Sequence, residues 1–439
     1  MAFDIRDEDD RLDEFEEYED VKQPTPQKFY RRRKFWICCI PTSIIGIIIA
    51  VILALYVIMP KIAQGLMNKA TINFSQIDIT NPSATSMDLV MIGEMQNTGP
   101  FHADISFPGI VTVSWNNIEL GTTVIPGSSS AAGGRGDLDL KSSFTVTNQA
   151  GFTEFSSYML NAESFVWHLE GKLNVKALGH TVKDLDLKKD ITVSAFNGLT
   201  GIAIKKFSLP GDDPSGNGII IEIDTTVTNP SAIQMYMGSL TLAISYKNTL
   251  MGYVTSSNLT MVRGPQTLSM KGVLIPQTTV EGLAVTSDMM SRYIGNVVTD
   301  TIATGFDVKP DGVNSVEWLS AAVKNLKLTV PLQSPQPLQL IKALNLGALG
   351  LVFTPPTAYE PITTSTGVLA NYTLPDGFGF NIQFTEVSNS FTLSRNDVPI
   401  ASLNSSYNPS TSDMAAGTLT FNLLQTPLIV PEASHQAFQ

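Results

Sequence analysis

Histidine and cysteine are the side chains that most often bind transition metals, and this sequence offers few of them. The four histidines are isolated from one another: His102, His168, His180 and His435. None pairs with another at the HxH or HxxxH spacing that directs two imidazoles at one ion. The only cysteines, Cys38 and Cys39, leave no thiol for zinc or redox chemistry in the rest of the chain. We therefore predict no metal centre and no cofactor.

Motifs for nucleophilic catalysis and phosphate binding are also missing. The sequence has no Gly-x-Ser-x-Gly elbow, no Walker loop and no GxGxxG spacing. Two aspartate pairs, Asp184/Asp186 and Asp212/Asp213, lie in strand-like and turn-like contexts where solvated carboxylates are common. Their ligands are too few for a calcium cage. We expect the protein not to be an enzyme.

Covalent modification is the chemistry that the sequence does suggest. Cys38 and Cys39 stand where juxtamembrane cysteines are palmitoylated, although two ordinary apolar residues of a helix are the alternative. Four asparagines begin N-x-Ser/Thr sequons, which are either glycosylation sites or chance matches: Asn73, Asn258, Asn371 and Asn404.

One group of apolar side chains has a functional alternative to core packing. Met235, Met237, Leu240 and Leu242 stand close together in a strand-like segment, and further methionines follow. Methionine is flexible and polarizable, so it suits a groove for an apolar ligand. Removing apolar surface from water is favourable by ~25 cal/mol per Å2, whether other core side chains or a ligand cover that surface. Both interpretations, a packed core and a lipid-binding groove, therefore stay open.

The first structural element that the sequence predicts is an apolar helix. Residues 35–59 contain no charge, and about 20 apolar residues cross a bilayer as a helix. We predict a transmembrane helix that ends before Pro60. The run starts late and exceeds the ~7–15 apolar residues of a signal peptide, so we expect it to be retained. A basic cluster before it predicts a cytosolic N-terminus: Arg31, Arg32, Arg33 and Lys34.

Residues 1–34 are predicted to be a disordered cytosolic tail, acidic at first and basic at its end. The segment from Tyr18 to Val21 fits a tyrosine-based sorting signal, with a solvated acidic tail as the alternative. The whole chain carries a net charge of −12, which argues against a nucleic-acid partner.

Beyond residue 70, alternating polar and apolar residues are interrupted by Asn, Pro, Gly and Ser, as in 218–224 (GIIIEID). This pattern predicts β-sandwich domains. Comparison of the chain with itself indicates a repeat, because 114–121 (SWNNIELG) aligns with 245–252 (SYKNTLMG) and 96–101 aligns with 228–233. A weaker third copy places 394–401 (SRNDVPIA) at the same point.

We therefore predict an all-β protein with minor α: a tail, one transmembrane helix and tandem sandwiches, each with a short helix. The predicted modules are a first repeat at 71–200, a second at 201–332 and an incomplete third at 338–439. Short helices are expected at 151–160 and 279–296. The third module lacks closing strands, so either the chain is a fragment or the module is completed differently. An unclosed sandwich would expose a strand edge.

This succession of strand, Asn-Pro-Ser turn (229–231), amphipathic strand, Tyr/Trp-x-Asn and Gly resembles the late-embryogenesis-abundant type 2 (water-stress/hypersensitive-response) domain. Tandem copies behind an acidic tail, a basic cluster and one span resemble fungal single-pass vacuolar-type membrane proteins with luminal domains of unknown function. The resemblance implies a seven-stranded, fibronectin type III-like sandwich with a helix. It also implies an endomembrane location, a lipid-carrying groove proposed for related domains, and no catalytic residue.

We expect a non-enzymatic, type II single-pass membrane protein whose repeats act as a binding or scaffold module at the vacuolar membrane, in vacuolar turnover or autophagy. The expected partners are the membrane itself, proteins bound through the luminal repeats, and a lipid ligand. A luminal lipid-binding or lipid-transfer module is the first alternative. A cell-surface or wall-facing adhesion scaffold is the second, because the plasma membrane and endoplasmic reticulum accept the same topology.

Overall fold

The computed structural model describes these residues: 33–126, 128–130, 133–334, 336, 338–355, 358–375, 377–380 and 383–438. For 33–42 and 128–130 it describes the backbone alone. Several sequence predictions therefore lie outside the described residues or side chains, namely those for the disordered tail, Tyr18, Arg31, Arg32, Arg33, Lys34, Cys38 and Cys39. The chain divides into two compact units, Met1–Lys61 and Ile62–Gln439.

The helix at the start of the described chain is apolar on every side from Ile44 to Ile58, and its last turns carry polar residues. It comprises α1 (Arg33–Leu53), a π-helical stretch η2 (Ala54–Ile58) and α2 (Met59–Lys69). Large apolar side chains between Ile44 and Ile58 are exposed at successive positions, which is unfavourable in water and favourable in a bilayer. Among the described residues, Ser43–Lys69 is the one helix long and apolar enough to cross a membrane.

This helix continues past the end that the sequence predicts. It runs through Pro60 because the preceding turn is wider than an α-turn: the amide of Met59 donates to the carbonyl of Ala54, five residues earlier. A π-turn shifts the carbonyl that the proline ring would otherwise meet.

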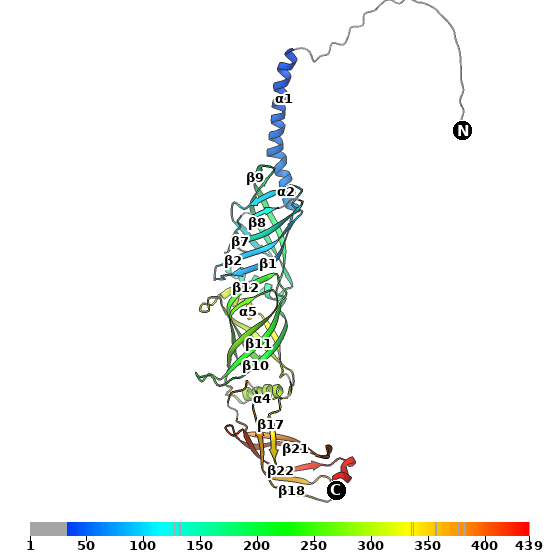
Figure 1. The fold of residues 1–439 in the computed structure, drawn as a ribbon. Coiled ribbons are helices and arrows are strands. Elements are labelled where there is room, and N and C mark those ends of the chain that lie inside the picture. The colour runs from blue at the N-terminus through cyan, green and yellow to red at the C-terminus, as the bar shows by residue number, and fades with distance from the viewer. Residues whose placement is uncertain are drawn as a thin grey trace, which may run out of the picture. The chain divides into compact units, whose positions relative to one another are not determined.

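Repeat 1 is a curled sheet with one helix (Figure 1), and seven principal strands make up the sheet. The strands are β1 (Thr71–Thr80), β2 (Ser86–Gln96), β4 (Val111–Trp115), β5 (Ile118–Val124), β7 (Arg135–Val146), β8 (Ser164–Ala177) and β9 (His180–Ser194). Two short strands, β3 (Ala103–Ser106) and β6 (Ser128–Ser130), extend it, and α3 (Gln149–Asn161) joins β7 to β8. Hydrogen-bonded neighbours follow the order β1-β2-β7-β5-β4-β8-β9.

Repeat 2 has the same order of neighbours, β10-β11-β14-β13-β12-β15-β16. Its strands are β10 (Thr200–Ser208), β11 (Ile219–Asn229), β12 (Ile233–Tyr246), β13 (Thr249–Met261), β14 (Gly264–Leu274), β15 (Thr299–Lys309) and β16 (Lys327–Leu332). Helix α4 (Val280–Ile294) corresponds to α3, whereas α5 (Glu317–Lys324) is added between the last two strands. The predicted fold class, all-β with minor α and tandem sandwich repeats, is confirmed.

The hairpin that revealed the repeat in the sequence has one backbone conformation in all three copies. Both central residues have positive φ: Asn116 and Asn117 (48° and 64°), Lys247 and Asn248 (46° and 62°), Asn396 and Asp397 (50° and 62°). Two consecutive positive φ values define the type I′ turn, whose twist matches the flanking strands. Asparagine and aspartate tolerate this region well, which explains their recurrence at this point.

Repeat 3 corresponds to the first five strands of repeat 2. It contains β17 (Ile341–Asn345), β18 (Leu349–Val352), β19 (Ile362–Tyr372), β20 (Glu386–Arg395), β21 (Val398–Asp413) and β22 (Thr418–Ile429), then η3 (Glu432–Ser434) and α6 (His435–Phe438). The order β17-β19-β22-β21-β20 matches β10-β11-β14-β13-β12. Within the described residues β20 pairs with β21 alone, whereas its counterpart β12 also pairs with β15.

Repeats 1 and 2 are joined by hydrogen bonds between their backbones. β1 pairs in parallel with the start of β12, with Ile77 opposite Ile233. The Asn-Pro-Ser turn lies at this joint: buried Asn229 donates to the carbonyl of Ile233 at 2.9 Å, and the hydroxyl of Ser231 donates to the carbonyl of Ser194 in β9 at 2.7 Å. The motif therefore holds the last strand of repeat 1 against the turn between β11 and β12 of repeat 2.

Candidate functional site: two adjoining apolar cavities

The interior wall of repeat 2 depends on a bulge in β12. Met235 and Met237 have odd positions and Leu240 and Leu242 even ones, so a regular strand would turn the two pairs to opposite faces. The pairing with β13 shifts register around Gly238, whose φ is +63°. A Cβ at that position would lie 2.3 Å from the carbonyl oxygen of Pro310. The bulge therefore brings all four side chains into the interior.

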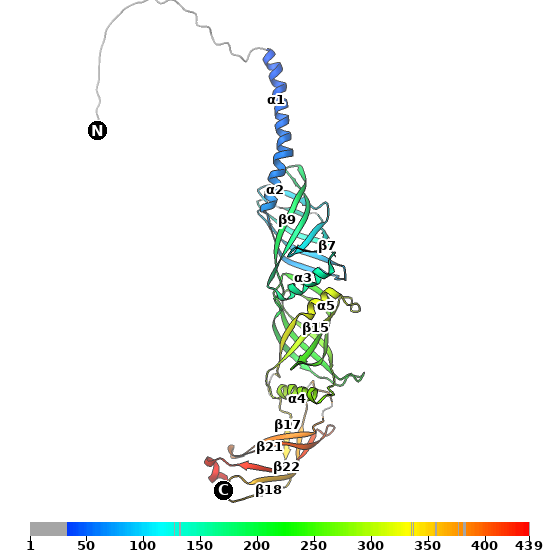
Figure 2. The same cartoon turned by 180° about the vertical axis from the view of Figure 1, so that it is seen from behind.

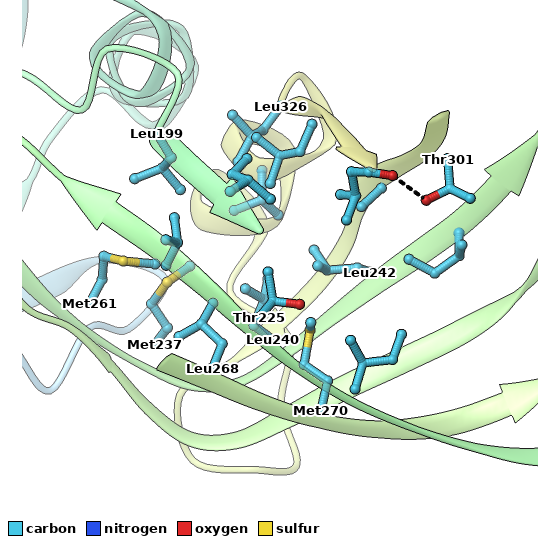
Figure 3. Close-up of a pocket in the computed structure, with 18 of the residues that line it drawn as sticks. Leu199, Thr225, Met237, Leu240, Leu242, Met261, Leu268, Met270, Thr301 and Leu326 are labelled. Atoms are coloured by element: carbon cyan, nitrogen blue, oxygen red, sulfur yellow. Dashed lines mark hydrogen bonds between the residues drawn. The ribbon is translucent and has the colours of Figure 1, made fainter. Parts of the chain in front are cut away.

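These four residues line a cavity of about 90 Å3 inside repeat 2 (Figure 3). The described lining consists of aliphatic, aromatic and methionine side chains with three hydroxyl-bearing residues, Ser156, Thr225 and Thr301, and no charged residue. Two of the hydroxyls are satisfied by backbone carbonyls: Ser156 donates to Phe152 at 2.7 Å and Thr301 to Val330 at 2.8 Å. Such a lining accepts hydrocarbon and rejects charge.

A second cavity of about 80 Å3 lies inside repeat 1 and is equally apolar. Its wall includes Met87, Met91 and Met95, which project from one face of β2. The one hydroxyl in the described lining, that of Thr123, donates to the carbonyl of Ser143 at 3.1 Å.

The two cavities share three wall residues, Met159, Met235 and Trp318. All three side chains are buried, at 4%, 3% and 2% exposure. Met159 comes from α3 of repeat 1, whereas Met235 and Trp318 come from β12 and α5 of repeat 2. These three residues therefore border both cavities, and two of them are flexible methionines.

Methionine is concentrated around both cavities. Seven methionines line the first and six the second, with two shared, so eleven of the 15 in the sequence face this interior. Unbranched thioether side chains change rotamer more easily than branched aliphatic ones, and methionine-rich surfaces adapt to ligands of different shape. The interior therefore has the capacity to enlarge around a guest.

Helices α3 and α5 lie side by side (Figure 2), and each contributes a residue, Met159 and Trp318, to the walls of both cavities. Trp318 of α5 packs edge-on against Phe152 of α3, with ring centroids 4.9 Å apart. Its indole nitrogen donates to the carbonyl of Ser83 at 2.8 Å, in the turn between β1 and β2, where residues 81–83 are a second Asn-Pro-Ser sequence. Trp318 therefore connects both repeats while closing their shared interior.

Helix α4 covers the other end of repeat 2 and is held by a polar contact. The carboxylate of Asp288 accepts a hydrogen bond from the Tyr246 hydroxyl at 2.5 Å and pairs with the Lys247 ammonium at 2.9 Å. The hydrogen bonds from Tyr246 and Lys247 hold the pKa of Asp288 below its usual value. Met289, the next residue, lines the cavity, so this contact holds one cavity wall in place.

In repeat 1 the equivalent contact is aromatic. Trp115, which aligns with Tyr246, packs on Tyr158 and Phe155 of α3 at centroid distances of 4.9 and 5.7 Å. The helix of repeat 1 is thus sealed by apolar packing, whereas the helix of repeat 2 depends on an ionised carboxylate.

The other sequence candidates lie away from the cavities. All four sequon asparagines are exposed on the repeats: Asn73, Asn258, Asn371 and Asn404. His168 pairs with Asp190 across two strands at 2.7 Å, and His435 stacks on Tyr359 at 3.4 Å. Neither pair faces the cavities.

Sequence reasoning missed several residues of this interior. Helix α5 was not predicted, and with it Trp318 was overlooked, although residues 317–324 place tryptophan, leucine, alanine and valine on one helical face. The cavity of repeat 1 was also missed. The even spacing of Met87, Met91 and Met95 within one strand is the signal that indicates it.

One family model matches the chain, described as a protein of unknown function (DUF3712), over residues 118–244. The match begins at β5 of repeat 1 and ends within β12 of repeat 2, so it includes the joint between them. No curated protein matches this sequence.

Proposed function

We propose that this protein is a membrane-anchored, non-catalytic module that holds the hydrocarbon part of a lipid inside its tandem sandwiches. The observation that carries the proposal is the pair of adjoining cavities, lined by methionine and aliphatic side chains without a charged residue. A match to a domain of unknown function that covers the later part of repeat 1 and the first part of repeat 2 is compatible with such a module.

Cavity size determines how a lipid would enter. Each cavity, at about 90 and 80 Å3, is smaller than the ~150 Å3 cavity that admits benzene in an engineered protein. An acyl chain therefore requires the methionine walls to rearrange, and Met159 and Met235 stand where such a rearrangement would join the two spaces. Rigid aliphatic walls would not permit this.

Membrane attachment is supported by the apolar helix and by contacts of its last turns. Gln64 of α2 donates to the carbonyl of Asp186 at 2.9 Å and accepts from its amide at 3.0 Å. Lys189 donates to the carbonyl of Asn68 at 3.1 Å, and Met67 lines the cavity of repeat 1. Cleavage as a signal peptide within α2 would remove part of this fold, so a retained anchor is the better interpretation.

We place the repeats on the lumenal side and the protein at the fungal vacuolar membrane, with a role in vacuolar turnover or autophagy. This part of the proposal rests on the resemblance to vacuolar-type proteins with domains related to the late-embryogenesis-abundant type 2 domain. Imaging the chain, tagged at its N-terminus, beside vacuolar and plasma-membrane markers tests it. A vacuolar rim is expected, and a cell-surface pattern would favour an adhesion scaffold instead.

The lipid proposal is tested by photo-crosslinking the full chain in phosphatidylcholine vesicles that contain a diazirine-bearing palmitoyl lipid. Adducts are expected on the apolar helix and also on cavity-lining peptides of β12 and β14. The helix adducts serve as an internal standard for probe delivery. Adducts confined to the helix would contradict the proposal.

A matched pair of variants sharpens this test. Leu240→Trp fills the cavity and is expected to lower the interior adducts about ten-fold, because overpacking costs ~1–3 kcal/mol. Leu283→Trp adds the same volume on α4, where the side chain is 55% exposed. This control variant is expected to leave the amount of interior adducts unchanged.

A second candidate function, a protein scaffold, is favoured by the edge of β20. This strand has one partner among the described residues, and an unpaired edge can add a strand from another molecule. The specific form we propose is edge-to-edge pairing of two copies. Sedimentation of the full chain in detergent tests it, and a mass that stays monomeric at micromolar concentration would remove this candidate.

A further inference from the structure

Thr225 interrupts an otherwise aliphatic stripe on the inner face of β11. The neighbouring inward residues are Ile221, Ile223 and Val227, all within the wall of the repeat 2 cavity. Thr225 is 6% exposed and lines the same wall (Figure 3). Valine would fill almost the same volume without a polar atom, so the hydroxyl is not needed for packing.

This hydroxyl is buried and has no hydrogen-bond partner among the described residues. The other two hydroxyls of the wall, those of Ser156 and Thr301, are each satisfied by a backbone carbonyl. In the ladders on its two sides Thr225 stands opposite Ile204 of β10 and Leu268 of β14. A buried polar group without a partner is unfavourable and rare in native proteins.

We propose that the Thr225 hydroxyl is the polar anchor of the cavity and binds a neutral oxygen on an otherwise apolar lipid, either a hydroxyl or an ester carbonyl. This inference rests on the proposed lipid-binding function. A carboxylate or phosphate is excluded as the buried group, because the described lining has no cationic side chain to pair with it. The ligand oxygen would satisfy Thr225 and select oxygenated chains over plain hydrocarbon.

The test uses three diazirine probes with the same sixteen-carbon chain: hexadecane, 1-hexadecanol and methyl hexadecanoate. Each is added to the full chain in phosphatidylcholine vesicles, and adducts on β11 and β14 peptides are counted relative to those on the apolar helix. Thr225→Val is expected to lower the ratio of oxygenated to plain adducts about five-fold, as the loss of one neutral hydrogen bond requires. Thr225→Ser is expected to preserve the ratio, and so is Thr226→Val, on the opposite face of β11 and outside the cavity lining.

The outcomes separate this inference from the proposed function. Absence of interior adducts for all three probes in the unaltered protein would overturn both. Interior adducts whose ratio does not change in Thr225→Val would overturn the anchor alone. A lower ratio for hexadecanol only identifies a hydroxyl ligand, and a lower ratio for the ester only identifies a carbonyl ligand. Thr225→Val is also expected to melt at a higher temperature without ligand, because it removes an unsatisfied buried group.

Discussion

At the scale of single residues, the ionised carboxylate of Asp288 holds α4 over the repeat 2 cavity. Its pKa is lowered in the folded protein by hydrogen bonds from Tyr246 and Lys247. Because the pKa is lowered, the Asp288 carboxylate stabilises the folded protein at any pH above the ordinary carboxyl pKa of about 3.9. This stabilisation is lost as the pH falls through the pKa of Asp288 in the folded protein.

We therefore expect α4 to open at acidic pH. Amide hydrogen exchange of 280–294 should accelerate as the pH falls below about 4, after correction for the intrinsic exchange rate. Asp288→Asn should show rapid exchange at every pH. Equal pH dependence in both proteins would mean that Asp288 does not hold the helix.

Gly238 is the residue on which the cavity wall depends. An alanine there would adopt a positive φ and place its Cβ 2.3 Å from the Pro310 carbonyl oxygen. Gly312 in the same region also has positive φ (78°) but open space around its Cβ.

Gly238→Ala is expected to cost several kcal/mol of the free energy of unfolding, against ~1 kcal/mol for Gly312→Ala, because only the first adds a backbone clash to the conformational cost. Amide hydrogen exchange in β12 and β13 measures the loss of stability in each variant. Equal losses of stability in the two variants would show that the bulge accommodates alanine at position 238.

At the scale of elements, α5 joins the two repeats through Trp318. Its 2% exposure, its contact with Phe152 and its hydrogen bond to Ser83 place it in the cores of both repeats. Trp318→Ala should cost ~3–5 kcal/mol, as large-to-small substitution at a packed aromatic site does.

The loss should appear as faster exchange in both α3 and β12, whereas Lys324→Ala, at an exposed position of the same helix, should change neither. Destabilisation restricted to repeat 2 would show that α5 belongs to that repeat alone.

At the scale of the whole molecule, the exposed sequons report on which side of the membrane the repeats lie. A lumenal position should give glycan at these asparagines, because none is buried. Each Asn→Gln replacement at a used site should remove one endoglycosidase-sensitive mobility increment. An unmodified protein from a glycosylating host would contradict the proposed orientation.

Local features of the sequence predicted much of the architecture. Period-2 alternation located the strands, the hairpin at Asn116–Asn117 and its copies revealed the repeats, and the uncharged run at 35–59 indicated the apolar helix. These three predictions succeed because each feature depends on residues that are close together in the chain: the alternation in a strand, the type I′ turn and the apolar character of a helix. The end of the helix was misplaced, because its π-turn lets it pass Pro60.

Local patterns in the sequence therefore establish the strands, the repeated hairpin and the methionine-rich character of the second repeat. Packing between distant segments turns Met235 and Leu240 to the same interior, because this depends on a bulge that Gly238 forms against Pro310, far along the chain. Packing also places Met159, Met235 and Trp318 in the walls of both cavities and leaves the Thr225 hydroxyl without a partner among the described residues. Cavities and unsatisfied groups arise from packing between distant segments, which no local pattern records.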